Sequence, residues 1–154
     1  MTGIVVLAAA VVLALGFGLY RRTTDGAFRG ADAPVVEVRG APAPSLETTW
    51  TRIAAAIPDA VPGERATFVQ FSSAFCAPCR TTRTLLTDVA ARTDGVVHLE
   101  VDAEKHLDLV RALDVRRTPT TLVLDPSGVE VTRASGAPRR DQVLAALDAL
   151  KETA

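Results

Sequence analysis

Four short apolar runs and four stretches of helical periodicity follow one another along the larger, C-terminal part of the chain. The apolar runs, each four to eight residues long and bounded by turn signals, predict strands over residues 66–72, 96–101, 120–124 and 129–134. The helical stretches predict helices over 45–57, from the cysteines to just before Asp94, around 107–113 and over 140–151. The order αβαβαββα predicts an α/β domain with a central mixed sheet, largely parallel, flanked by helices and ending in an antiparallel hairpin.

The helical spacing also predicts which side chains face the core. Ser45 is the expected N-cap of the first helix of this domain, which Pro58 follows, and Asp125–Gly128 is the expected hairpin turn. The following residues are expected to face inward: Trp50, Ile53, Ala54, Ile57, Leu85, Leu86, Val89, Leu107, Val110, Leu113, Val143, Leu144, Leu147 and Leu150.

A different pattern occupies the N-terminus, where Gly3–Tyr20 is 18 residues without a charge or a polar face. As a helix this run would span about 27 Å, close to the thickness of the hydrocarbon core of a bilayer. A cleaved secretory signal would need basic residues before the apolar core and a small-residue cleavage site after it, and neither is found. A buried helix of a soluble domain would need a polar face. We therefore expect a single-pass membrane helix over residues 1–22, with residues 3–20 in the bilayer.

Charge around this run predicts its orientation. Four arginines follow within about 20 residues, namely Arg21, Arg22, Arg29 and Arg39, against only the α-amine before it. By the positive-inside rule, we expect the C-terminal domain on the cytoplasmic face of the cell membrane. The alternative, an extracytoplasmic domain, would change the redox environment of the two cysteines.

Composition separates the folded domain from the segment that precedes it. Residues 23–44 are rich in Gly, Ala and Pro and predict a linker, in which 35–38 is a possible short edge strand. Residues 45–154, roughly 110 in number, suffice for one domain with its own core. The net charge of −1 with no basic stripe argues against nucleic acid as a partner.

The only two cysteines, Cys76 and Cys79, lie where the first predicted strand of the domain ends and a helix begins. A helix N-terminus offers unpaired N–H groups and partial positive charge, which favour the reactive thiolate. Pro78 suits a first helical turn, because its missing N–H is not needed there. The Cys-Ala-Pro-Cys segment therefore indicates a dithiol that cycles between reduced and oxidised forms.

The order of elements, with Cys-x-x-Cys after the first core strand, resembles the thioredoxin family. Three further segments match: Arg117-Thr118-Pro119-Thr120 where the family has its cis-proline loop, the turn Asp125–Gly128, and Gly136 after the last strand. The resemblance covers about residues 45–151. It implies a membrane-anchored thiol–disulfide oxidoreductase, more similar to the reducing members, that acts on protein disulfides and dithiols, has no cofactor beyond its own disulfide and depends on an electron donor that the sequence does not identify.

The resemblance also implies roles for individual residues. Cys76 would be the exposed nucleophile and Cys79 the buried resolving thiol. Pro119 would be a cis-proline beside the Cys76 sulfur, and Thr118 and Thr120 would offer a backbone edge to substrate. Phe75 and Gly136 would complete the substrate-binding surface.

The sequence departs from the family at several positions. Phe75 replaces the usual tryptophan, and Ala77 the usual glycine. Gln70 stands where thioredoxins have a buried acid, and His98 where they have a lysine. A glutamine cannot accept the proton of Cys79, whereas a histidine titrates near neutrality. Gln70 and His98 are therefore either a proton-transfer pair or a satisfied polar pair without a catalytic role, and the second interpretation is favoured because buried polar groups are hydrogen-bonded in any case.

Other functions for the cysteine pair remain as alternatives. A structural zinc site needs four ligands. His98 and His106 are not at the spacing that is usual for the second pair of ligands in such a site. The copper chaperones of this fold use a wider Cys-x-x-x-Cys spacing, so no metal site is expected. A non-catalytic binding module is the third alternative, since fold does not imply function; the presence of both cysteines and Pro119 argues against it.

Overall fold

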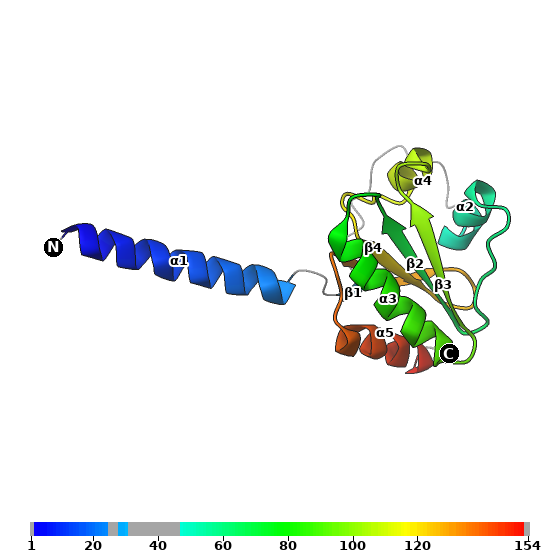
Figure 1. Cartoon of the computed structure of the whole chain (residues 1–154). Helices are drawn as coiled ribbons and strands as arrows, with labels where there is room; N and C mark the ends of the chain where they lie inside the picture. Colours follow the sequence, from blue (N-terminus) through cyan, green and yellow to red (C-terminus); the bar gives the residue numbers. More distant parts are fainter. Residues whose placement is uncertain (1, 25–27, 31–46, 153–154) are drawn as a thin grey trace, which may run out of the picture.

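A computed structural model describes residues 2–24, 28–30 and 47–152 (Figure 1). The helices are α1 (Thr2–Thr24), α2 (Thr49–Ala56), α3 (Ala77–Ala91), α4 (Leu107–Ala112) and α5 (Arg140–Glu152). The strands are β1 (Phe28–Gly30), β2 (Ala66–Ser72), β3 (Val96–Asp102), β4 (Thr120–Leu124) and β5 (Glu130–Ser135). From α2 onward the order is the predicted αβαβαββα.

The five strands form one mixed sheet in the order β1-β5-β4-β2-β3. Only β2 and β3 are parallel, while β2 with β4, β4 with β5 and β1 with β5 are antiparallel. The prediction of a largely parallel sheet was therefore wrong, because most of the strand pairs are antiparallel. The predicted hairpin of β4 and β5 is confirmed. Strand β2, which lies between β4 and β3, is buried along its whole length, because helices cover both faces of the sheet.

Two apolar clusters fill the two layers of the core. One joins α3 and α5 to the face of β2 that carries Phe68, and the other joins α2 and α4 to the face that carries Val69 and Phe71. Trp50 packs against the second cluster, which agrees with its expected core position. The two-residue alternation along β2 continues into Gln70 and Ser72, so these polar side chains lie on the α3 side.

Helix α2 begins later than the sequence predicts. Its N-cap is Thr48, whose hydroxyl oxygen accepts a hydrogen bond from the backbone N–H of Thr51 at 3.2 Å. The expected N-cap Ser45 lies outside the described residues, as does the possible strand over 35–38. The start of α2 is also tied to the hairpin turn, because the N–H of Trp50 donates to the carbonyl oxygen of Gly128 at 3.0 Å.

Two side chains that were expected to face inward do not. Leu107 is 52% exposed and Leu144 is 41% exposed, whereas Leu109 and Val143 are buried in their helices. Helix α4 has only six residues and docks through Leu109, which turns Leu107 toward solvent. In α5 the contact with the sheet is made by Val143, Leu147 and Leu150, so Leu144 lies at the edge of that stripe.

The N-terminal segment contains a strand that the sequence did not predict. β1 lies inside the range assigned to the linker and pairs with β5 so that Phe28 stands opposite Ala134. Phe28 is partly buried against the α3 and α5 cluster. Before it, α1 extends away from the sheet domain (Figure 1). Within the described part of the chain, no helix was found to have both the length and the apolarity of a membrane span.

Candidate active site

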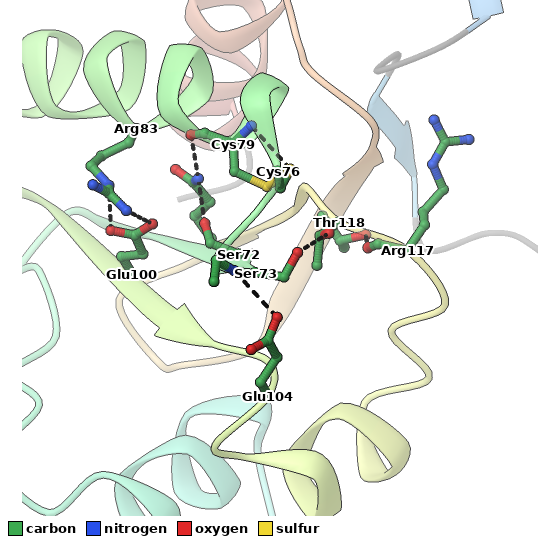
Figure 2. The surroundings of a disulfide bond; sticks show 12 residues. Ser72, Ser73, Cys76, Cys79, Arg83, Glu100, Glu104, Arg117 and Thr118 are labelled. Atoms are coloured by element: carbon green, nitrogen blue, oxygen red, sulfur yellow. Dashed lines mark hydrogen bonds and ion pairs between the residues drawn. A yellow bond between two sulfur atoms is a disulfide. The ribbon is translucent and has the colours of Figure 1, made fainter.

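Cys76 and Cys79 form a disulfide at the start of α3, directly after the loop that follows β2 (Figure 2). Cys76 is the N-cap residue with extended backbone, and Pro78 occupies the first turn as predicted. The backbone N–H of Cys79 donates to the Sγ of Cys76 at 3.1 Å. The sulfur of Cys76 therefore takes the place that a capping oxygen usually has, where the helix dipole stabilises negative charge.

The two cysteines differ in accessibility. Cys79 is 1% exposed, whereas Cys76 is half-buried and its neighbour Phe75 is 97% exposed. A disulfide or thiol of another molecule can therefore approach Cys76 but not Cys79. The disulfide therefore has an outer and an inner sulfur, and the roles of nucleophile and resolving thiol stay a prediction.

The predicted cis-proline loop lies beside the disulfide. The Thr118–Pro119 peptide bond is cis, as expected. The hydroxyl of Thr118 is 3.0 Å from the hydroxyl of Ser73, which joins this loop to the segment before Cys76 (Figure 2). Gly136 donates its N–H to the carbonyl oxygen of Pro119 at 2.8 Å and has a φ of +108°, a conformation that favours glycine. Gly136 thus supports the loop through its backbone, and its binding role stays a prediction.

Beneath the disulfide, the side chain of Gln70 is fully buried and fully hydrogen-bonded. Its Nε2 donates to the carbonyl oxygen of Cys79 at 2.9 Å and to the Oγ of Ser72 at 2.7 Å. Its Oε1 is 3.2 Å from the Nε2 of His98. Since both protons of the Gln70 amide are already donated, Oε1 is the acceptor and His98 Nε2 carries a proton.

The imidazole of His98 contacts the side chain of Gln70 and does not contact Cys79. Its Nδ1 is 3.0 Å from the hydroxyl of Thr87 and accepts from it when Nε2 is protonated. Burial lowers the pKa of His98, and the positive charge of Arg83 lowers it further, while the carboxylate of Glu100 opposes both effects. The imidazole is therefore held as a neutral member of a polar cluster, which agrees with the favoured interpretation; proton transfer through the pair stays a prediction.

A cavity of about 330 Å³ adjoins the disulfide between α3 and β3. It is lined by Ser72, Ser73, Ala74, Cys76, Cys79, Arg80, Arg83, Glu100 and Asp102. Two of the lining residues, Arg83 and Glu100, lie on the opposite side of the disulfide from Thr118 and Arg117 (Figure 2). Both cysteines therefore line a cavity with polar walls on the β3 side.

Glu100 and Arg83 form a two-point ion pair in this cavity, with contacts of 2.6 and 2.5 Å. Burial alone would raise the pKa of Glu100, but hydrogen bonds from Arg83 and Ser72 and the charge of Arg83 outweigh it and lower the pKa. Ser72 accepts from Gln70 and donates to Glu100, so a chain of hydrogen bonds leads from the carbonyl of Cys79 to the cavity.

Several residues around the disulfide were not predicted from the sequence. Glu104 accepts a hydrogen bond from the backbone N–H of Ala74 at 3.3 Å, and Ser73 contacts Thr118 as described. The position of Glu100 near the site could have been predicted from the sequence. It follows His98 by two residues in β3, and alternate residues of a strand lie on the same face of the sheet. Among residues 2–24, 28–30 and 47–152, no group of three or more His, Cys, Asp or Glu side chains is placed to hold a metal ion.

A disulfide that caps a helix after a buried interior strand, beside a cis-proline loop, is the arrangement of the thioredoxin-like thiol–disulfide oxidoreductases. Comparison of this sequence with known protein families also indicates a thioredoxin-like protein. The profile of the thioredoxin family matches residues 48–149, and the chain belongs to the thioredoxin family. Cys76 and Cys79 are thus the active-site Cys-x-x-Cys pair of a thioredoxin domain.

Individual relatives match parts of the chain. The human Thioredoxin domain-containing protein 2 is 40% identical over 58 residues, which are 38% of this chain and 10% of that protein. Rice Thioredoxin H2-2 is 32% identical over 75 residues, which are 49% of this chain and 54% of that protein. The chain thus spans less than two thirds of the length of either relative. The crystal structure of spinach chloroplast thioredoxin f superimposes with a TM-score of 0.51 at 23% identity, over 58% of this chain and 79% of that one, and shows the fold.

Proposed function

We propose that this protein exchanges disulfides with other proteins, with Cys76 as the attacking thiolate and Cys79 as the resolving thiol. The observation that carries the proposal is the difference in exposure between the two sulfurs of one disulfide at the start of α3. The half-buried Cys76 accepts a backbone N–H at 3.1 Å, which stabilises its thiolate, while the buried Cys79 can reach only Cys76.

The proposed reaction begins with the reduced dithiol. The thiolate of Cys76 attacks one sulfur of a substrate disulfide, and the other substrate sulfur leaves as a thiolate that takes up a proton. Cys79 then loses its proton and attacks the Sγ of Cys76, which releases the first substrate sulfur and leaves the Cys76–Cys79 disulfide. Two electrons pass to the substrate, and an external dithiol must return them before the next turnover.

The full-length protein and two variants of it test this assignment with a fluorescent peptide disulfide. Turnover is followed with dithiothreitol as the donor, and adduct formation is followed with reduced protein from which the reductant has been removed. The unaltered protein is expected to turn over, Cys79→Ser to accumulate a covalent peptide adduct, and Cys76→Ser to do neither. An adduct on Cys76→Ser, or turnover by either variant equal to that of the unaltered protein, would contradict the assignment.

We further propose that the physiological direction is reduction of substrate disulfides. The Ala77-Pro78 pair between the cysteines supports this by analogy with the reducing members of the family. Equilibration with glutathione is expected to give a reduction potential nearer to about −270 mV, as in thioredoxin, than to about −120 mV, as in a strong oxidant. A value near the second figure would instead support an oxidase.

A membrane anchor with the thioredoxin domain on the cytoplasmic side is the remaining part of the proposal. It rests on the uncharged run Gly3–Tyr20, on the arginines that follow it, and on the exposure of apolar side chains along α1, such as Leu13 at 73%. The anchor is not supported by the helices that the structure describes, none of which has both the length and the apolarity of a span. Extraction of cell membranes at alkaline pH tests the anchor, because a peripheral protein is released and a spanning one is retained.

Sidedness is tested separately in intact cells with a membrane-impermeant reductant and then an impermeant maleimide. Labelling of Cys76 only after lysis is expected. Labelling in intact cells would place the domain outside the cytoplasm and assign it to exported thiol–disulfide exchange.

A further inference from the structure

The cavity beside the disulfide contains four charged side chains, and three of them are already neutralised. Glu100 is paired with Arg83 through two contacts. Asp102 accepts from the backbone N–H of Glu104 at 2.9 Å and lies 3.4 Å from the Nζ of Lys105. Both acids of the cavity therefore have cationic partners supplied by the protein itself.

Arg80 is the fourth charged residue of the cavity and differs from the others. It lies one position after Cys79 in the first turn of α3, and it is exposed. Within the described part of the chain, its guanidinium has no ion pair or hydrogen bond, while its backbone carbonyl accepts from Thr84. The cavity thus presents one cation whose five N–H donors are directed to solvent beside the reactive sulfurs.

We propose that this cavity is a subsite for a carboxylate next to the reacting cysteine of the substrate, so that the protein prefers disulfides in acidic peptide segments. The inference rests on the proposed thiol–disulfide exchange and adds a substrate class to it. Arg80 is the residue that recognises the carboxylate, and the hydroxyls of Ser72 and Ser73 border the same space. Thr118 of the cis-proline loop, where the resemblance places the substrate backbone, lies on the other side of the disulfide (Figure 2).

The size of the effect follows from the exposure of Arg80. An ion pair at a solvent-exposed site is weak and screened by salt, so the preference should be about two- to five-fold at low ionic strength and smaller at high ionic strength. Planar guanidinium and carboxylate groups pair through two hydrogen bonds, so Arg80→Lys should keep only part of the preference.

The test measures single-turnover reduction of three peptide disulfides that differ only in the residue beside the cysteine: Glu, its neutral isostere Gln, or Lys. Full-length protein is reduced, freed of reductant and mixed with each peptide, and each rate is divided by that with dithiothreitol to remove intrinsic differences in leaving-group reactivity. The Glu-to-Gln ratio is taken within each variant, so that any change in the reactivity of Cys76 itself cancels.

We expect a ratio of about two to five for the unaltered protein, a ratio near one for Arg80→Gln, and unchanged ratios for two control variants. Arg111→Gln removes an exposed arginine of α4, remote from the cavity, and Arg117→Gln removes the arginine beside the cis-proline loop. A ratio near one in the unaltered protein, a preference that survives Arg80→Gln, or one that disappears in Arg117→Gln would overturn the proposed subsite. Failure to reduce any of the peptides would instead contradict the proposed function itself.

Discussion

The side-chain nitrogen of Gln70 donates a hydrogen bond of 2.9 Å to the carbonyl oxygen of Cys79, beneath the disulfide. This contact fixes an uncharged amide at the position where the family has a buried acid. Because the Gln70 amide cannot take up a proton, the proton of Cys79 must leave by another route in the proposed disulfide exchange. The cavity that Cys79 lines offers such a route through solvent.

The first prediction concerns the structural role of Gln70. In Gln70→Leu, the carbonyl of Cys79 and the Oγ of Ser72 lose a donor while they stay buried, and His98 loses its acceptor. We expect a decrease of about 1–3 kcal/mol in the free energy of unfolding, measured by urea denaturation. A variant as stable as the parent would show that water replaces these contacts without cost.

The second prediction concerns the pH dependence of stability. The pKa of His98 is lowered in the folded protein below its usual 6.5, first by burial, so the unfolded chain binds the proton more tightly. Its contribution to stability is therefore complete above about pH 6.5 and decreases as the pH falls below that value. In His98→Gln this part of the pH dependence should disappear from unfolding curves recorded between pH 5 and 8, whereas equal slopes for both proteins would contradict the lowered pKa.

The same variant separates the two interpretations of His98. Since its ring contacts Gln70 rather than Cys79, we expect the pH–rate profile of disulfide reduction to be unchanged in His98→Gln. A selective loss of rate near neutral pH, without unfolding, would support the proton-transfer hypothesis instead.

A third prediction concerns Glu100 in the cavity. In Arg83→Gln the carboxylate loses the hydrogen bonds and the positive charge of Arg83 and keeps only the donor Ser72, so its pKa should rise. Titration of the side-chain carboxyl carbon by NMR measures this directly, with a midpoint below 4.5 in the parent and a higher one in the variant. Identical midpoints would mean that the ion pair does not persist in solution.

The fourth prediction uses two leucines with opposite surroundings. Leu86 is fully buried between α3 and the sheet, so Leu86→Ala should cost about 2–5 kcal/mol of stability. Leu107 is half exposed, and Leu107→Ala should change stability by less than about 0.5 kcal/mol. Thermal unfolding of the two variants side by side tests this difference, and a large effect at Leu107 would indicate that α4 packs differently from the structure described here.

The elements that the sequence predicts well are those whose apolar pattern is unbroken. The bounds of β2 and β4 agree with the predicted 66–72 and 120–124, because each is a buried apolar run between clear turn signals. The place of the cysteine pair at a helix start also follows from the strand and helix pattern, whereas the cis bond before Pro119 and the place of Gln70 beneath the cysteines follow from the resemblance to the thioredoxin family.

What escaped prediction depends on contacts between distant segments. β1 has only three residues, Phe28–Gly30, and no alternation, so its pairing with β5 carries no local signal. The ion pair of Arg83 and Glu100 joins residues 17 positions apart, and the hydroxyl pair of Ser73 and Thr118 joins residues 45 apart. Such pairs become visible only when the register of the strands is known.

The pairing of β1 with β5 determines how far the N-terminus of the chain can be truncated without exposing the edge of the sheet. A fragment that begins at residue 45, the domain boundary expected from composition, would lack Phe28–Gly30 and leave the backbone of β5 unpaired along Thr132–Ala134. It would also uncover the apolar surface beneath Phe28. An unpaired strand beside exposed apolar surface invites pairing between copies, so such a fragment should self-associate, whereas one that begins before Phe28 retains a covered edge.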